Sequence, residues 1–137
     1  MKRTATAHWE GDLKSGKGHL STQSTVLNKS QYSFNTRFEN GAGTNPEELL
    51  AAAHAGCFTM AIGNILGQAG TPATSLDTTA AVTLEGLAIT AVHLSIKGKV
   101  PNISAEKFAE VTKAAEQGCL VSKVLNIPIT SDSELLK

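Results

Sequence analysis

Two cysteines, Cys57 and Cys119, are the only thiols in the chain. Cys57 lies in an apolar run that opens with two carboxylates, and Arg37 lies just upstream of that run. A thiolate is the reactive form of cysteine, and a cation or hydrogen-bond donor beside it stabilises the charge. A second thiol can capture the oxidised sulfur as a disulfide. These residue types together indicate the chemistry of a thiol peroxidase.

The surroundings of Cys57 also fit an inert thiol. A cysteine in an apolar helix is usually a packing residue, and burial by itself raises the pKa of a thiol. A mid-helix position forgoes most of the charge effect of the helix N-terminus. A reactive Cys57 therefore requires a partner from elsewhere in space, and the residues alone leave both interpretations open.

Arg37 is the candidate cation, and Glu47 is the candidate carboxylate that orients it. Arg37 falls on a predicted strand. The alternative to a role beside the thiol is that Arg37 faces solvent there and pairs with Glu39. A bidentate pair with a carboxylate would hold the guanidinium in place, although Glu47 also fits a helix capping box. Ten residues separate Glu47 from Cys57, a rise of about 15 Å along a regular helix. The two share a site only if the helix is broken or a second subunit supplies one of them.

Cys119 and His54 each have a functional and a structural interpretation. Cys119 follows Gly118 at a predicted helix interruption, from which a mobile thiol can reach an oxidised Cys57; its alternative is a small apolar residue that fills a gap. His54 lies three residues before Cys57 and could act there as a base. A lone histidine on an apolar helix is more commonly a packed core residue. The histidines and cysteines show no metal-ligand spacing, and no glycine cluster has the context of a phosphate loop. We therefore expect no metal and no cofactor.

Composition narrows the remaining classes of function. A chain of 137 residues predicts a single domain over residues 1–137. Lys plus Arg and Asp plus Glu number 12 each, so charge provides no reason to expect binding to nucleic acid or to an anionic membrane. We expect no apolar run to approach the ~20 residues of a membrane span. The polar N-terminus lacks a signal core, so we expect a cytoplasmic protein with reduced thiols.

Hydrophobic periodicity predicts strands first and a long helix next. Strands are predicted over residues 4–10, 18–25 and 32–38, and a helix over 44–66. The helix begins either with Thr44 and Glu47 as its capping box or with Asn45 as its cap and Pro46 in the first turn. A hairpin over 76–84 and 89–100, a helix capped by Ser104, a short turn at 121–125 and a strand over 127–134 follow. This order predicts an α+β fold.

These segments resemble the OsmC/Ohr family of peroxide-detoxifying proteins, and more closely its OsmC branch. Five stretches carry the resemblance, which covers nearly the whole chain: Ala7–Asp12, Phe34–Phe38, Gly43–Leu49, Ala53–Phe58 and Gly118–Ser122. The block from Asn45-Pro46-Glu47 to Cys57-Phe58 is the most specific. The chain departs from the family pattern after Cys119, where Leu120 stands at a position that is often proline.

The resemblance implies an intertwined homodimer in which antiparallel sheets wrap around central helices and the sites lie at the subunit interface. It implies that Cys57 is the peroxidatic thiol and Cys119 the resolving thiol, with Arg37 and Glu47 poising the thiolate. Organic hydroperoxides are the implied substrates, with hydrogen peroxide used less well. A dithiol, such as a lipoyl group on a protein, is the implied reductant, and no metal or flavin is implied.

Two other functions fit the same residues. The protein fits a peroxide-responsive redox sensor or partner-binding dimer in which turnover is incidental, and it fits a structural dimer with inert thiols. For an enzyme, apolar residues near the thiol favour a hydroperoxide with an alkyl tail. The candidates for that apolar surface are Leu50, Phe58 and Met60.

Overall fold

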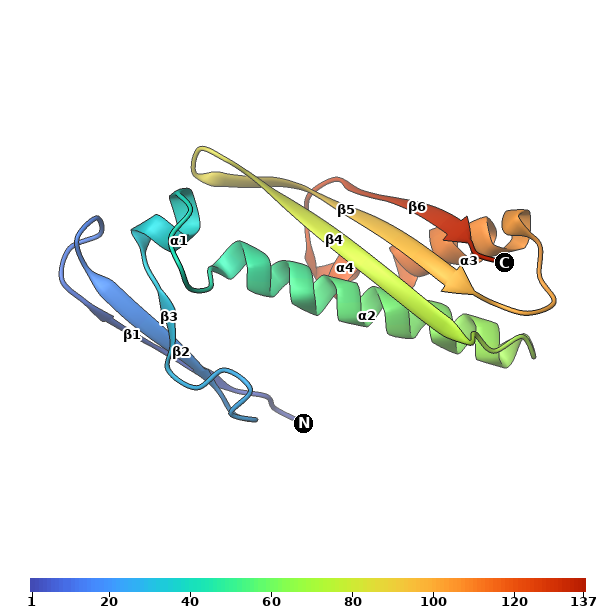
Figure 1. Ribbon diagram of the computed structural model, residues 1–137, viewed down its shortest axis with the longest axis horizontal. Coiled ribbons are helices and arrows are strands. Elements are labelled where there is room, and N and C mark those ends of the chain that lie inside the picture. The colour runs from blue at the N-terminus through green and yellow to red at the C-terminus, as the bar shows by residue number, and fades with distance from the viewer. The chain divides into compact units, whose positions relative to one another are not determined.

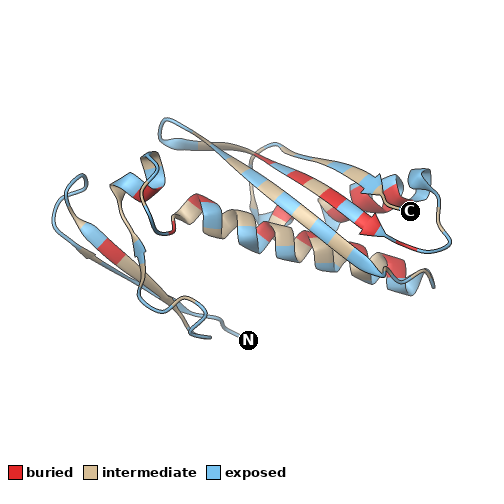
Figure 2. Ribbon diagram, in the orientation of Figure 1, coloured by how far each residue is buried: buried red, intermediate tan, exposed pale blue.

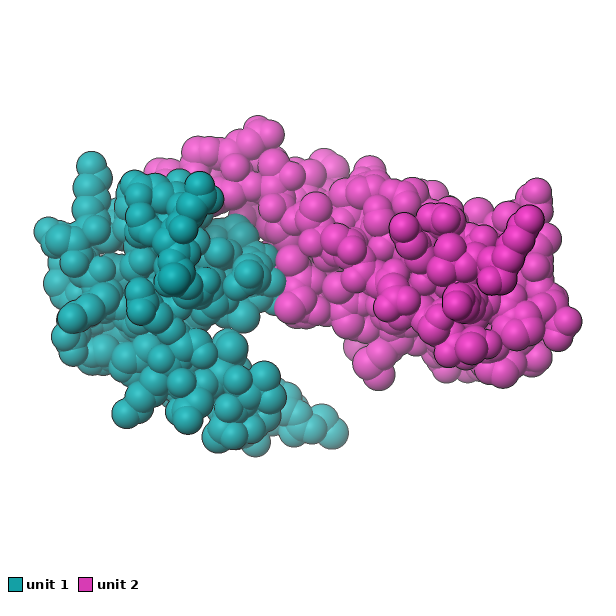
Figure 3. All heavy atoms as spheres, viewed as in Figure 1, with its two compact units in different colours: residues 1–49 teal, residues 50–137 magenta.

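The computed structural model describes residues 1–137, which divide into two compact units, Met1–Leu49 and Leu50–Lys137 (Figures 1 and 3). The expectation of a single domain stays a prediction. The first unit holds β1 (Ala5–Glu10), β2 (Lys17–Thr22), β3 (Ser30–Tyr32), α1 (Phe34–Phe38) and the start of α2 (Pro46–Gln68). The second holds the rest of α2 followed by β4 (Ser75–Glu85), β5 (Ala88–Lys99), α3 (Ala105–Gly118), α4 (Leu120–Val124) and β6 (Ile129–Leu135). The fold is α+β, as the order of elements predicts.

The first unit is built on an antiparallel sheet in the order β1-β2-β3. Gly18 is the second residue of β2 and pairs with Trp9 on β1 and with Tyr32 on β3. A Cβ at position 18 would lie 2.7 Å from an atom of each ring. The missing side chain thus lets the two rings close over β2, with their centroids 5.5 Å apart.

The segment predicted as a strand over 32–38 is largely helical. It forms α1, because Ser33 and Thr36 make a reciprocal capping box: the Ser33 hydroxyl accepts from the Thr36 backbone N–H, and the Thr36 hydroxyl accepts from the Ser33 N–H. Such a cap supplies hydrogen bonds that a strand would otherwise take from its neighbour. Arg37 therefore lies on a short helix, and its placement on a strand was wrong.

Asn45 is the residue that caps α2. Its side chain accepts a hydrogen bond from the Glu48 N–H at 2.7 Å, and Pro46 is the first helical residue. Thr44 instead donates its hydroxyl to the Glu48 carboxylate at 2.8 Å. This choice places Glu47 in the first turn of α2, with its carboxylate free to take a partner other than the cap.

The second unit contains a mixed sheet in the order β4-β5-β6. β4 and β5 form the predicted antiparallel hairpin, whereas β6 pairs with β5 in parallel. The expectation of purely antiparallel sheets is wrong here, because α3 and α4 carry the chain back before β6 begins, and such a crossover aligns two strands in parallel. Ser104 caps α3 as predicted, by accepting from the Lys107 N–H.

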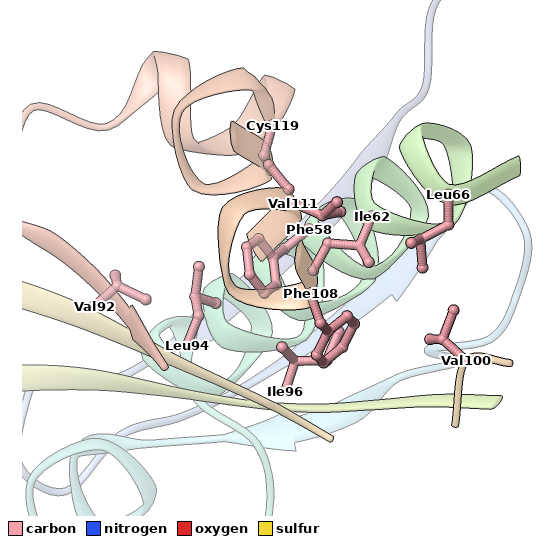
Figure 4. Packing of buried hydrophobic residues seen from close by; sticks show 11 residues of the cluster. Phe58, Ile62, Leu66, Val92, Leu94, Ile96, Val100, Phe108, Val111 and Cys119 are labelled. Carbon is pink, nitrogen blue, oxygen red and sulfur yellow. The ribbon is translucent and has the colours of Figure 1, made fainter. Parts of the chain in front are cut away.

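The hydrophobic core lies within the second unit. Figure 4 shows side chains from α2, α3 and β5 packed together, and Figure 2 shows the alternating burial along β5. Phe58 and Phe108 are both fully buried there. Every buried hydrophobic residue of this core belongs to the second unit: Phe58, Ile62, Leu66, Val92, Leu94, Ile96, Val100, Phe108, Val111, Ala115 and Cys119. The first unit contributes none, so it has no buried apolar core of its own.

Helix α2 is apolar on nearly all sides. Its most apolar window has a mean hydropathy of 1.6, yet only 22% of that window is buried. By length and composition alone α2 could cross a membrane, a test that the core helix of a water-soluble protein also passes. The expectation that no apolar run would be this long was therefore wrong. A helix without a polar face is normally covered by other protein or by lipid.

Candidate functional site

The structure brings the two cysteines together. Cys57 is half-buried on α2, Cys119 is 1% exposed between α3 and α4, and both are free thiols. Their side chains form a hydrogen bond with each other. A hollow of ≈ 430 Å³ lies beside them, lined by Cys57, Met60, Ala61, Gly118, Cys119 and Leu120. Cys57 is the more exposed of the two and borders this hollow.

Two helices that meet at Cys119 hold its backbone in place. The Cys119 N–H donates to the Ala115 carbonyl of α3, and its carbonyl accepts from the Lys123 N–H of α4. Cys119 is thus both the C-cap residue of α3 and the N-cap residue of α4, with an extended backbone (φ −60°, ψ 133°). The predicted interruption after Gly118 is this junction. It turns the chain so that the amides at the start of α4 lie against Cys57.

The surroundings of Cys57 favour its thiolate. Burial raises the pKa of the Cys57 thiol, but hydrogen bonds from the Cys119 thiol and from the Val121 and Leu120 N–H groups outweigh burial and lower it. Donors aimed at a sulfur stabilise the anion more than the neutral thiol. Cys57 therefore has the partner from elsewhere in space that a reactive mid-helix thiol requires.

The surroundings of Cys119 have the opposite net effect. Burial raises its pKa, and so does its hydrogen bond to Cys57, while the backbone and side chain of Ser122 lower it only in part. In the hydrogen bond between the two thiols Cys119 is therefore the donor and Cys57 the acceptor. The pKa of Cys57 is thus lowered and that of Cys119 is raised, which distinguishes the two thiols chemically.

Arg37 and Glu47 form an ion pair within the first unit. Arg37 Nε and Nη2 both donate to Glu47 Oε1, at 3.0 and 2.8 Å. The pair is not the expected two-oxygen fork, since Oε2 is buried without a hydrogen-bond partner. The Glu47 side chain is 9% exposed and that of Arg37 is 41% exposed. The alternative pair of Arg37 with Glu39 is absent, because Glu39 accepts from Asn35 instead.

An aromatic pocket of ≈ 270 Å³ lies next to Arg37. Four of the six aromatic residues of the chain line it. The Phe34 and Phe38 rings lie 4.8 Å apart, and the Arg37 guanidinium lies 5.5 Å from the Phe38 ring centroid. The full lining is Trp9, Leu13, Tyr32, Ser33, Phe34, Arg37, Phe38 and Pro46. Sequence reasoning missed this pocket, although the gathering of aromatics upstream of α2 was a signal for it.

The apolar residues expected around Cys57 differ in their roles. Met60 is 77% exposed and lines the hollow, as expected, but Phe58 is fully buried and points into the core (Figure 4). Phe58 cannot contact a substrate, because α2 turns residues 57 and 58 toward different sides. Leu50 is half-buried and does not line the hollow.

The Arg37–Glu47 pair and the two cysteines belong to different units, and α2 is one unbroken helix from Pro46 to Gln68. Glu47 and Cys57 are therefore separated by about 15 Å of helix rise within one chain. The broken-helix alternative is excluded by this continuity. No three His, Cys, Asp or Glu side chains are grouped closely enough to hold a metal ion.

The amide hydrogen of Leu120 is open to a direct test. Leu120→Pro removes this donor at the first position of α4, where proline fits and where the extended Cys119 tolerates a following proline. We expect the pKa of Cys57 to rise, because the thiolate loses a hydrogen bond. The rate of Cys57 alkylation is measured by mass spectrometry at a series of pH values. In the variant, the rise of this rate should shift to higher pH, and the two rates should become equal at high pH, where both thiols are ionised. Leu120→Ala keeps the N–H and should show no shift; equal profiles for both variants would remove this amide from the site.

A family model described as OsmC-like protein matches residues 39–134. Peroxiredoxin OsmC of Escherichia coli (strain K12) is 53% identical over 139 aligned positions, which cover 98% of this chain and 97% of that protein. Peroxiredoxin OsmC of Shigella flexneri matches to the same extent. The residues matched by the family model include Glu47, Cys57 and Cys119, whereas Arg37 lies two residues before its start.

Solved structures agree with the fold. The organic hydroperoxide resistance protein OhrB of Bacillus subtilis is 25% identical with a TM-score of 0.71, and the alignment covers 97% of this chain and 98% of that one. An OsmC-like protein of Vibrio cholerae has a TM-score of 0.77 at 14% identity, over 98% and 99% of the two chains. The thiol pair, the fold and the sequence matches thus lead to one conclusion: the chain belongs to the OsmC-like family.

Proposed function

We propose that this protein is a thiol peroxidase that reduces organic hydroperoxides, and hydrogen peroxide less well. The observation that carries the proposal is the hydrogen-bonded pair of Cys57 and Cys119, in which the half-buried Cys57 has a lowered pKa and the buried Cys119 a raised one. The name peroxiredoxin of the 53% identical relatives supports a peroxidase-type activity.

The proposed reaction has three steps. The Cys57 thiolate attacks the terminal oxygen of the hydroperoxide, and the O–O bond breaks to give the Cys57 sulfenic acid. The alkoxide or hydroxide that leaves takes up a proton from solvent and becomes an alcohol or water. The Cys119 sulfur then attacks the Cys57 sulfenic acid, which releases water and forms the Cys57–Cys119 disulfide. A dithiol, such as a lipoyl group on a partner protein, reduces this disulfide by exchange and is itself oxidised. No metal or cofactor is required.

Arg37 and Glu47 are proposed to act on the cysteines of a second copy of the chain. Arg37 would donate to the peroxide oxygens and stabilise the developing charge, while Glu47 holds the guanidinium in place. Two observations support a homodimer: the first unit has no apolar core, and most of α2 is uncovered in the single chain. A three-stranded sheet without a core is unstable alone, so a partner surface would stabilise it.

The aromatic pocket is proposed to hold the organic part of the hydroperoxide. It adjoins Arg37, so a tail in the pocket would place the O–O group near the guanidinium. Its apolar lining favours alkyl and aryl tails over water-sized peroxides. We also propose a cytoplasmic location, where thiols stay reduced, and no nucleic-acid or membrane partner.

The cysteine chemistry is tested first by dithiol-dependent consumption of cumene hydroperoxide. We expect multiple turnovers in wild type, none in Cys57→Ser, and a mapped Cys57–Cys119 disulfide after one equivalent of peroxide. Cys119→Ser should keep the first oxidation but recycle slowly and over-oxidise. Oxidation of Cys57 without sustained turnover would favour the redox-sensor alternative, and two free thiols after peroxide would favour the structural one.

The aromatic pocket is tested by comparing kcat/KM for cumene hydroperoxide and hydrogen peroxide. Wild type should prefer the aryl substrate, because its tail is removed from water in the pocket. Phe34→Ala should lower kcat/KM for cumene hydroperoxide about tenfold and leave the value for hydrogen peroxide within twofold of wild type. An equal loss with both substrates would contradict a role in binding the tail.

Sharing of the site between subunits is tested by mixing two inactive variants. Arg37→Ala and Cys57→Ser should each have little activity alone. Where the site takes Arg37 from one subunit and Cys57 from the other, half of the reassembled dimers carry one intact site, so activity returns to about a quarter of wild type. The matched control is Glu39→Gln, which alters a nearby residue outside the ion pair. This variant should be active without mixing. No recovery after verified subunit exchange would mean that both groups act within one chain or that Arg37 is dispensable.

A further inference from the structure

A buried histidine and serine join α2 to α4 beside the cysteines. His54 is fully buried one turn before Cys57, and its Nε2 lies 2.7 Å from Ser122 Oγ. Ser122 is 8% exposed and also forms a hydrogen bond with the Cys119 side chain. The other ring nitrogen of His54, Nδ1, is buried without a partner. The mechanism proposed above uses neither residue.

The unpartnered Nδ1 indicates which way the hydrogens point. If the Ser122 hydroxyl donated to Nε2, the hydrogen of a neutral ring would sit on Nδ1 as a buried donor without an acceptor. An orphaned buried N–H is rarer than an unused acceptor. The ring hydrogen is therefore assigned to Nε2, which donates to Ser122 Oγ, and the hydroxyl hydrogen is left to donate to the Cys119 sulfur. Burial lowers the pKa of His54, which is consistent with a neutral ring.

We propose that Ser122 is the hydrogen-bond donor to Cys119 in the resolving step, and that His54 is the positioning residue that directs the Ser122 hydroxyl to that sulfur. The inference rests on the proposed peroxidase function. As Cys119 gives up its proton and attacks, negative charge develops on its sulfur, and a donor already aimed at that sulfur stabilises it without reorganisation.

The step balances without a further reactant. The Cys119 sulfur forms a bond to the Cys57 sulfur, the S–O bond of the sulfenic acid breaks, and the departing hydroxide takes up the proton that Cys119 released, as water. Cys119 is oxidised and Cys57 is reduced to the disulfide level. The groups that act on Cys119 are the Cys57 thiol from α2 and, from α4, Ser122 and the Val121 backbone N–H; no charged side chain contributes. His54 acts through Ser122.

The donor is tested without peroxide by ultraviolet thiolate absorbance against pH in a Cys57→Ser background, where Cys119 is the only thiol. Ser122→Ala should raise the pKa of Cys119 by about one unit, because the thiolate loses its donor. Ser122→Thr keeps a hydroxyl and should restore the wild-type value. Thr112→Val, which removes another buried hydroxyl that bonds only to the Phe108 carbonyl, is the matched control and should leave the pKa unchanged.

The kinetic arm follows disulfide formation by stopped flow after Cys57 is oxidised. Ser122→Ala and His54→Phe should slow this peroxide-independent phase about threefold at neutral pH, because the roughly tenfold loss of thiolate is partly offset by the greater nucleophilicity of a more basic thiolate. The pH profile of this phase should move upward, while the rate of the preceding oxidation changes much less. His54→Gln, which keeps an N–H donor, should recover part of the rate. An unchanged Cys119 pKa in Ser122→Ala, or an equal slowing of both phases, would overturn the inference. Failure of wild type to form any Cys57 sulfenic acid would instead overturn the proposed function.

Discussion

The continuity of α2 is the constraint on which the site depends. Its backbone hydrogen bonds run unbroken from Pro46 to Gln68, so the distance along the helix between Glu47 and Cys57 is set by the rise per residue. A side chain cannot bridge about 15 Å. In the proposed site, two helices from two copies of the chain bring together the ion pair at the start of one helix and the thiol at the middle of the other. One regular element therefore makes assembly part of the proposed chemistry.

The cysteine site illustrates how backbone geometry controls reactivity in an apolar helix. Burial on α2 would by itself leave Cys57 protonated and inert. The junction of α3 and α4 changes this, since it presents the Cys119 thiol and two backbone N–H groups to the Cys57 sulfur. The same junction buries Cys119 and raises its pKa. The surroundings thus shift the pKa values of two chemically identical side chains in opposite directions, down for the half-buried Cys57 and up for the buried Cys119.

The distribution of apolar residues links stability to the site. The fully buried hydrophobic residues lie in the second unit, whereas the aromatic residues of the first unit line an open pocket next to Arg37. A sheet whose aromatic side chains form a pocket cannot also use them as a sealed core. The proposed partner copy would supply the missing cover and a thiol at the same time.

Local patterns in the sequence determined most of the elements: the alternation in β4 and β5, the cap at Ser104, the long helix, and the candidate residues Cys57, Cys119, Arg37 and Glu47. The prediction from sequence failed where two local signals of similar strength compete. Residues 32–38 were predicted as a strand from their alternating pattern, but the capping box at Ser33 makes most of this segment helical. Only the tertiary structure decided that Arg37 pairs with Glu47 rather than Glu39, that Phe58 faces the core, and that Ser122 lies between His54 and Cys119. These contacts join residues distant along the chain, and periodicity and propensity carry no information about which distant side chains meet.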